Sequence, residues 1–369
     1  MKTVALIRST GIYNDSRATK EIYALIEAGY KVLVLGWDRD GVSGARSKEV
    51  FCSVSSSVDF FFYEQPLSNG IGMKNIHKLC GWFCWVYKTL KRETNIYAVH
   101  ACDLDSGVPA YRFCKKKKKK LIYDIYDYYV DSRSVPSVLG GIVEGVEIKI
   151  INFAFATIIC TEERREQIAR ANPQRVLIVH NSPEMPCIPS EDEKYDYVYC
   201  GSLAGKRLIK EIFEAYEANA DLSFAFAGYG EYETLARDLQ TQNDRFEFFE
   251  TIPYSKVLEL EAQTKVLAAI YEPTIRNHRL CAPNKFYEAL ALGKPVIVCK
   301  GTGIDKIVEN NNIGICIDYD AEQFYGALRK LITSPDERRE MGIRARKLYD
   351  EKYSWEKMKK ILTEFYIGI

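Results

Sequence analysis

The segment that decides the fold is residues 282–298, which read APNKFYEALALGKPVIV. A proline at the start of a helical pattern is tolerated, because the amide proton that it lacks would have no partner in the first turn. Gly293 then ends the pattern, and an apolar, β-rich run follows Pro295. The segment therefore predicts a helix over 283–292 and a strand over 295–299, which together form the repeating step of an α/β fold.

The same alternation of short apolar runs and helical patterns extends over both halves of the chain. Runs this apolar on both faces belong in a parallel sheet that helices cover. The other predicted strands are 3–7, 31–35, 59–63, 96–100, 121–124, 157–160 and 176–179, then 197–200, 222–226, 245–249, 266–271 and 313–317. The other predicted helices are 17–28, 74–92, 107–116 and 140–155, then 206–218, 231–240, 321–332, 336–352 and 355–366.

Residues 181–194 interrupt this alternation with three prolines and four acidic residues, and they show no periodicity. We predict that they form an interdomain linker. Two series of strand–helix repeats around such a linker imply an α/β protein with two doubly wound, Rossmann-like domains that face each other across a cleft. The predicted domains are 1–180 and 195–350, and the helical segment 351–369 is expected to pack back on the first domain.

The net charge of +1 conceals an asymmetry between the two halves of the chain. Residues 1–180 hold 26 Lys and Arg against 19 Asp and Glu, which leaves an acidic excess in residues 181–369. The basic half is a candidate for an anionic partner. No nucleic-acid-binding motif accompanies this charge, so nucleic acid is not the expected partner.

The eleven cysteines include no Cys-x-x-Cys pair, and most of them lie in apolar runs, as reduced thiols do in cytoplasmic proteins. The four histidines are scattered, so no transition-metal site is predicted. The N-terminus leads directly into a strand, unlike a signal peptide, and no apolar stretch has the roughly 20 residues that a membrane span requires. We therefore expect a cytoplasmic protein.

Lys285 and Glu288 lie three positions apart and therefore on one face of the helix predicted over 283–292. A helix N-terminus with a cation beside it, at the end of a strand in a doubly wound sheet, is a seat for a diphosphate. A carboxylate one turn further along can accept hydrogen bonds from both hydroxyls of a ribose. The alternative interpretation is a capped amphipathic helix with an incidental charge pair.

The run from Glu288 to Ile297 (EALALGKPVI) resembles the nucleotide-binding motif of GT-B glycosyltransferases, in particular the retaining family 4. Further segments resemble motifs of that family in the family's order: 14–32, 99–103, 122–127, 199–207, 227–230, 249–253 and 301–309. The resemblance implies a transferase whose co-substrate is a nucleotide-diphosphate sugar, with no cofactor. It implies donor contacts at Gly201, Ser202, Gly228, Ile252, Asn284 and Glu288, where Glu288 holds the ribose, and acceptor-side roles for Asn14, Asp15, His100 and Asp103.

Three positions depart from the family's pattern. Leu280 stands where a glutamate near the donor sugar is common, although a subset with a Pro-Asn-Lys motif, which residues 283–285 match, also lacks that glutamate. Ser202 stands where an arginine is usual, so that the diphosphate is left to Arg207 and Lys285. Tyr126 replaces a histidine that is common in the acceptor-side loop, and it is followed by Asp127.

The implied reaction breaks the anomeric C–O bond and places charge on the leaving diphosphate and on an oxocarbenium-like sugar. Without a metal, fixed cations and amide groups must stabilise this charge, and Arg207, Lys285 and the helix N-terminus can supply them. Asp127 is the candidate carboxylate beside the acceptor hydroxyl or the sugar cation. The alternatives are a solvated arginine at the start of a helix for Arg207 and a hydrogen-bonded structural side chain for His100. A retaining outcome rests on the resemblance alone.

Residues 73–93 place four aromatic side chains among basic residues, and residues 115–120 are six consecutive lysines. Basic residues that flank aromatic ones suit a helix at a membrane interface, which favours docking on an anionic leaflet to reach a lipid-linked acceptor. The alternative is a helix that packs its aromatic side chains on the first sheet and leaves its lysines in solvent.

Other functions compete with this interpretation. The altered positions Leu280, Ser202 and Tyr126 are compatible with a catalytically impaired, nucleotide-sugar-binding subunit of a transferase complex. An epimerase or a phosphorylase of the same plan would need an acid–base histidine set or a pyridoxal-phosphate lysine, and neither is identifiable. A nicotinamide dehydrogenase is disfavoured because residues 8–15 lack the glycine fingerprint. The expected acceptor is a glycan or a lipid-linked glycoconjugate, and UDP is the preferred donor base by its frequency alone.

Overall fold

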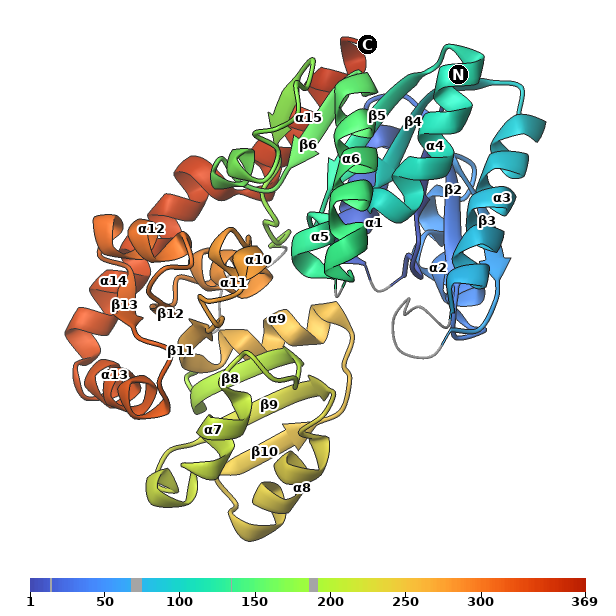
Figure 1. The fold of residues 1–369 in the computed structure, drawn as a ribbon. Coiled ribbons are helices and arrows are strands. Elements are labelled where there is room, and N and C mark those ends of the chain that lie inside the picture. Colours follow the sequence, from blue (N-terminus) through green and yellow to red (C-terminus); the bar gives the residue numbers. More distant parts are fainter. Residues whose placement is uncertain (14, 68–74, 134, 186–191) are drawn as a thin grey trace. The chain divides into compact units, whose positions relative to one another are not determined.

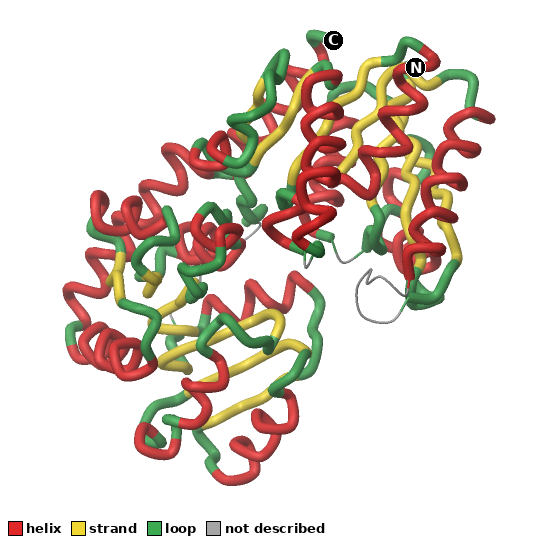
Figure 2. Tube along the Cα trace, viewed as in Figure 1, coloured by secondary structure: helices red, strands yellow, loops and turns green. Residues whose placement is uncertain are grey.

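The computed structural model describes residues 1–13, 15–67, 75–133, 135–185 and 192–369. Figure 1 shows the ribbon, and Figure 2 shows helices and strands alternating along the whole trace. The chain forms two compact units, of which the first comprises Met1–His180 with Met358–Ile369 and the second Asn181–Lys357. Part of the predicted linker, residues 186–191, lies outside the described residues.

The first unit is built on a seven-stranded sheet in the order β3-β2-β1-β4-β5-β6-β7, and every pair of neighbours is parallel. Its central strands are buried on both faces, which is why their sequences are apolar without alternation. The strands are β1 (Thr3–Arg8), β2 (Lys31–Asp38), β3 (Val58–Glu64), β4 (Ile96–Cys102), β5 (Lys120–Ile125), β6 (Ala156–Ile159) and β7 (Val176–Ile178).

The helices of the first unit connect consecutive strands, and α3, α4 and α6 lie side by side. The last helix, α15, returns to this unit: the hydroxyl of Tyr30 donates to the carbonyl oxygen of Tyr366 (2.6 Å), and Lys359 pairs with Glu27 (2.9 Å). The helices are α1 (Ser16–Glu27), α2 (Ser43–Val50), α3 (Ile76–Arg92), α4 (Asp103–Lys117), α5 (Tyr129–Ser132), α6 (Ser137–Phe153) and α15 (Trp355–Ile367).

The second unit has a six-stranded sheet in the order β10-β9-β8-β11-β12-β13, again with parallel neighbours. The strands are β8 (Tyr195–Ser202), β9 (Phe224–Tyr229), β10 (Phe246–Phe249), β11 (Thr264–Ala269), β12 (Val296–Cys299) and β13 (Gly314–Ile317). The helices are α7 (Ile209–Glu214), α8 (Glu233–Gln242), α9 (Tyr254–Ala262), α10 (Arg276–Arg279), α11 (Asn284–Leu292), α12 (Ile304–Asn311), α13 (Ala321–Thr333) and α14 (Pro335–Leu348).

Both sheets reverse their strand order at one place, between β1 and β4 in the first unit and between β8 and β11 in the second. Open α/β sheets bind ligands at the carboxyl ends of the strands beside such a reversal. The carboxyl ends of β1 and β4 carry Arg8 and Asp103, and that of β8 carries Gly201. The prediction of an α/β protein with two doubly wound parallel sheets is confirmed, and the reversals show where to look for sites.

One predicted helix needs correction. The helix expected over 206–218 is the short α7, because Lys206 and Leu208 have positive φ angles of 68° and 60° that no helix accommodates. Arg207 therefore lies on a loop and not at the start of a helix. The structure also adds α9, which the sequence patterns did not predict and which turns out to support the second-unit site.

The aromatic side chains of α3 pack inward. Trp82 is fully buried, and its ring stacks on those of Trp37 and Trp85 at centroid distances of 5.6 Å. Phe83 and Tyr87 also pack against the core of the first unit. The aromatic cluster of the segment 73–93 thus belongs to the sheet layer, although residues 73 and 74 lie outside the described part of the chain. In that part, no helix combines the length and the apolar character of a membrane span.

Candidate active site

The carboxyl ends of β8 and β9 approach each other through two glycines. Gly201 and Gly228 are partners in the strand register, and a Cβ atom on Gly228 would lie 1.8 Å from the carbonyl oxygen of Gly201. Gly228 also has a φ of 150°, a conformation that side chains rarely adopt. The position therefore requires glycine, and the edge of the sheet offers backbone groups there instead of side chains.

Lys285 reaches this glycine turn from the first turn of α11. Its ammonium donates a hydrogen bond to the carbonyl oxygen of Cys200 and lies 4.6 Å from the ring centroid of Tyr199. A Cβ atom on Gly201 would come within 3.4 Å of Nζ, so the charge lies directly beside the turn. Burial lowers the pKa of Lys285, but Glu261 and other neighbours outweigh burial and hold the pKa above its usual value. The side chain is a permanent cation at this site.

Glu288 lies one turn further along α11 and is buried. Its Oε1 accepts a hydrogen bond from the hydroxyl of Tyr254, the first residue of α9 (2.9 Å). The oxygen of another carboxyl group, that of Glu261, lies 3.9 Å from Nζ of Lys285. One ammonium and two carboxyl groups therefore meet between α9 and α11.

Arg207 is the second cation near the end of β8. Its Nη1 donates to the hydroxyl of Tyr199 (3.4 Å), and its guanidinium lies 5.2 Å from the ring centroid of Tyr271. Among the described residues, no carboxylate pairs with it within 4 Å. Burial lowers the pKa of Arg207, but Tyr271 and Tyr199 outweigh burial and hold the pKa above its usual value, so the guanidinium stays charged. A partly buried guanidinium with no described carboxylate partner can bind an anion.

The other residues that were predicted to contact the donor are placed as follows. The backbone carbonyl of Ser202 accepts a hydrogen bond from Tyr199 (2.8 Å), Asn284 is exposed at the start of α11, and Ile252 is half-buried just before α9. Leu280, at the position where the family's glutamate is common, is buried. The structure thus brings Gly201, Lys285 and Arg207 together at the sheet edge, with Glu288 behind them.

In the first unit, the carboxyl ends of β1, β4 and β5 meet around Asp103. Arg8 pairs with Asp15 (2.8 Å) and with Asp103, and Asp103 accepts hydrogen bonds from the backbone amides of Tyr126 (2.9 Å) and Asp127 (3.2 Å). Asp103 and Asp15 therefore hold the loops at this edge, and Asp15 also caps α1. The predicted Asn14 lies outside the described residues.

Asp127 differs from its neighbours because it is exposed. Its side chain keeps 54% of its accessible surface and approaches Nη2 of Arg164 at 3.4 Å. Tyr126, by contrast, is covered on its ring by the guanidinium groups of Arg8 (4.2 Å) and Arg17 (4.8 Å). Of these two loop residues, Asp127 is the one whose polar group faces solvent at the carboxyl edge of the sheet.

Residues 184–348, which span most of the second unit, match the family model described as Glycosyl transferases group 1. The chain carries a glycosyltransferase group 1 domain. The predicted enzyme class is thereby confirmed, and the cationic edge at β8 belongs to the matched region. No curated protein matches the sequence significantly.

Solved structures with the same fold cover the whole chain of this glycosyltransferase. Sucrose-phosphate synthase from Thermosynechococcus elongatus is 15% identical, with a TM-score of 0.78 over 100% of this chain and 99% of its own. HepE from Anabaena, solved with UDP and glucose, is 14% identical, with a TM-score of 0.72 over 100% of both chains. A variant of TarM from S. aureus, solved with fondaparinux, α-GlcNAc-glycerol and UDP, is 12% identical, with a TM-score of 0.70 over 99% and 100%. At these identities the likeness establishes the GT-B fold.

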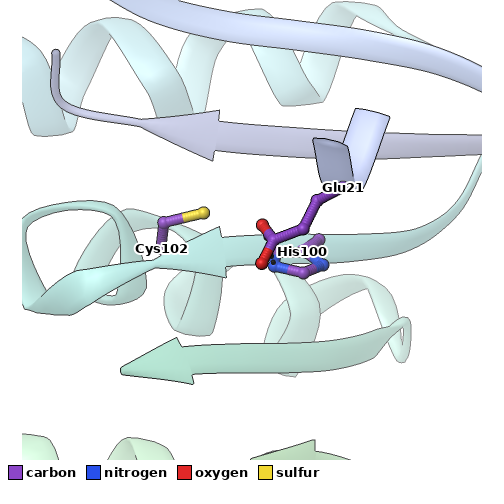
Figure 3. Close-up of side chains that lie close together, drawn as sticks. All are labelled: Glu21, His100 and Cys102. Carbon is purple, nitrogen blue, oxygen red and sulfur yellow. Dashed lines mark ion pairs between the residues drawn. The ribbon is translucent and has the colours of Figure 1, made fainter. Parts of the chain in front are cut away.

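Near the carboxyl edge of the first sheet lies a buried polar cluster that includes Glu21, His100 and Cys102 (Figure 3). Nδ1 of His100 is 2.7 Å from the hydroxyl of Tyr366, and Nε2 is 3.3 Å from Oδ2 of Asp124. Both ring nitrogens are engaged inside the unit. His100, which was predicted as an acceptor-side residue, is fully buried inside the unit.

Glu21, His100 and Cys102 could each offer one ligand atom to a metal, since these atoms lie within 4.8 Å of one another. Two carboxyl groups of the cluster are, however, already held by Arg17. Its Nη2 donates to both oxygens of Asp124 (2.9 and 3.1 Å), and its Nε lies 2.9 Å from Oε1 of Glu21. Burial alone would raise the pKa of Asp124, but Arg17 lowers it to about 2. The donor set fits a closed hydrogen-bonded network better than a metal centre.

Sequence patterns did not identify Glu261, Arg17 or Glu21 as residues of these two sites. A signal was nevertheless present. Glu261 lies seven positions after Tyr254 and three after Leu258, and therefore on the face of α9 that is buried, and Arg17 and Glu21 lie four positions apart on the buried face of α1. Charged residues that lie among apolar ones on one face of a helix indicate a buried network of polar side chains.

Proposed function

We propose that this glycosyltransferase moves a sugar from a nucleoside-diphosphate sugar, preferably a UDP-sugar, to a glycan or lipid-linked acceptor in the synthesis of a surface polysaccharide or glycoconjugate. The observation that carries the proposal is the pair of cations at the carboxyl end of β8, where Arg207 has no carboxylate partner among the described residues and Lys285 lies beside a side-chain-free glycine turn. HepE and TarM, which share the fold, were solved with UDP. Their bound ligand supports UDP as the nucleotide of the donor.

In this proposal, the diphosphate lies against the Gly201 turn and between Arg207 and Lys285. As the anomeric C–O bond breaks, the electron pair goes to the leaving phosphate oxygen, and the two cations and the amide groups at the start of α11 stabilise its charge. Glu288, held by Tyr254, accepts hydrogen bonds from the ribose hydroxyls. These groups supply the stabilisation without a metal or a cofactor, and we propose a retaining outcome on the family resemblance.

On the acceptor side, Asp127 is the proposed partner of the acceptor hydroxyl, because its carboxylate is exposed at the carboxyl edge of the first sheet. Arg8, Asp15 and Asp103 shape the loop that presents it. A carboxylate within hydrogen-bond reach of the hydroxyl can take its proton as the new bond forms.

We further propose that the protein acts in the cytoplasm and reaches a lipid-linked acceptor by docking on an anionic membrane surface. Since the aromatic side chains of α3 pack inward, basic side chains would carry this contact: Lys88, Lys91 and Arg92 of α3 and the lysines of the segment 115–120. Sedimentation with vesicles that contain anionic lipid should bring the protein down, whereas neutral vesicles should not. Equal recovery in both supernatants would rule out this docking.

The test of the donor proposal is nucleotide binding. UDP, GDP and their sugars are compared in a thermal-shift panel, since a ligand at 100 times its Kd stabilises by about 2.7 kcal/mol. We expect UDP or a UDP-sugar to give the largest shift and the double variant Arg207→Ala/Lys285→Ala to show none. A crystal soaked in UDP and in GDP that left the β8 edge empty, or placed the nucleotide in the first unit, would overturn the proposal. Detectable donor hydrolysis or transfer would exclude an impaired binding subunit.

A further inference from the structure

Helix α9 supports the donor side from behind with two residues that lie seven positions apart, and therefore on one face of the helix. Tyr254 donates to Glu288 (2.9 Å), and Glu261 approaches Lys285 (3.9 Å). Tyr254, at the start of α9, thus contacts the later residue of α11, and Glu261, near the end of α9, contacts the earlier one. One face of α9 therefore touches both side chains of α11 that the proposed function assigns to the donor.

Glu261 is the unusual member of this group. It is completely buried, and neither of its oxygens accepts a hydrogen bond from any described residue. An ionised carboxylate without a donor is costly to bury, because it has lost the hydrogen bonds of water and gained none. Lys285, at 3.9 Å, is beyond hydrogen-bond distance. This environment favours the neutral acid over the anion.

The charges of the group lead to the same state. If Glu261 and Glu288 were both ionised, two buried negative charges would face the single positive charge of Lys285. Like charges that share a buried site raise the affinity of one of them for a proton. Glu288 has the hydroxyl of Tyr254 as a donor, which stabilises its anion, whereas Glu261 has none. With the proton on Glu261, the group is neutral.

We propose that Glu261 is a buried, neutral carboxylic acid that positions, from behind α11, the side chains that α11 presents to the donor nucleotide. Burial and the neighbouring Glu288 both raise the pKa of Glu261, and the side-chain interaction between the two carboxyl groups acts in the same direction. Glu261 itself is a positioning residue, since it lies behind α11 and acts through Glu288 and Lys285. The inference rests on the proposed function.

The experiment compares UDP binding, by calorimetry at neutral pH, in Glu261→Gln, in Glu261→Leu and in the wild type. The Gln variant keeps the size, the polarity and the neutral state of the protonated acid, so its Kd should stay within about twofold of the wild type. The Leu variant fills a similar volume without a donor, and its Kd should rise by about tenfold, the equivalent of about one lost hydrogen bond. Glu259→Gln is the matched control, because Glu259 lies on the exposed side of α9 and pairs with Lys256.

Each outcome decides a different point. Loss of affinity in both variants would show that the anion is required and would overturn the proposal, as would unchanged affinity in Glu261→Leu. Absence of UDP and GDP binding in the wild type would instead sink the proposed function. A measurement on the wild type avoids dependence on variant folding: infrared spectra at neutral pH should contain the carbonyl stretch of a protonated carboxyl group that disappears in Glu261→Gln. If the two spectra are identical, Glu261 is ionised and the proposal fails.

Discussion

The two units each bury a group of carboxylates beside a basic side chain, but they complete these groups differently. In the first unit, Arg17 binds Asp124 with two hydrogen bonds and pairs with Glu21, and His100 uses both ring nitrogens. In the second unit, neither oxygen of Glu261 accepts a hydrogen bond from a described residue, and the nearby Arg207 has no described carboxylate partner. A network that the chain completes by itself stabilises the fold, whereas in the proposed function the uncompensated guanidinium of Arg207 binds the anionic donor.

The largest effect that this comparison predicts is on stability, in Arg17→Met. The substitution leaves the carboxyl groups of Asp124 and Glu21 buried without their cation, and breaking such a pair typically destabilises by about 3–5 kcal/mol. Urea unfolding followed by tryptophan fluorescence measures it, since Trp37 and Trp82 are buried in the first unit. The transition of that unit should move to a clearly lower urea concentration.

The matched control for this variant is Arg170→Met. Arg170 pairs with Glu144, but its side chain is 72% exposed, and exposed pairs contribute about 0–1 kcal/mol. If Arg17→Met proved no more destabilising than this control, the first-unit network would not be a stabilising one, and the contrast between the two groups would disappear.

The next effect in size is on catalysis, in Arg207→Ala. If the guanidinium stabilises the leaving diphosphate, its loss should lower turnover by about 10²-fold, as the loss of one oxyanion donor does elsewhere, equivalent to about 2.7 kcal/mol. The melting temperature should hardly change, because no carboxylate loses its partner. Steady-state rates with the donor sugar and acceptor measure the effect.

Arg329→Ala provides the control, because Arg329 also lies in the second unit but pairs with Asp221 (2.7 Å). Its turnover should match that of the wild type. Normal turnover in Arg207→Ala would mean that the uncompensated guanidinium is not a catalytic group, and the second-unit group would then have to be explained in structural terms.

The sequence predicts the local features of this molecule but not its buried networks. Strand positions and the pair Lys285 and Glu288 are predictable, because periodicity and a helix face act within one short segment. The networks are not, since their members are distant in sequence: Arg17 and Asp124 are 107 positions apart, and His100 and Tyr366 are 266. Only packing brings them together, so a strand-end histidine could not be distinguished beforehand from an acceptor-side residue.

The sequence patterns also did not predict that α7 begins only at Ile209. Residues 206–218 have a helical pattern, but the chain adopts positive φ angles at Lys206 and Leu208, and the backbone amide of Leu208 donates to the hydroxyl of Tyr319 (2.8 Å). This tertiary contact is made by a residue 111 positions away and overrides the local preference. It leaves Arg207 on a loop at the sheet edge, which is where the proposed diphosphate site needs it.

The last predicted effect concerns Glu147, another buried carboxyl group. It accepts hydrogen bonds from the hydroxyl of Tyr123 (2.8 Å) and the amide of Tyr129 (3.3 Å), and it has no ion pair among the described residues. Burial raises its pKa from 4.5 to about 8. Because the folded chain then keeps a proton that the unfolded chain releases, stability should fall as the pH rises from about 4.5 to about 8.

Glu147→Gln removes this titration and should therefore gain stability relative to the wild type as the pH is raised from 5 to 8. The gain in melting temperature should be larger at pH 8 than at pH 5, and each kcal/mol of it corresponds to about 2–4 °C for a unit of this size. Glu144→Gln, on the same helix but paired with Arg170 at the surface, should show no such divergence. A constant difference between Glu147→Gln and the wild type across this range would mean that Glu147 is ionised when folded, and that a buried carboxylate here needs neither a cation nor a proton.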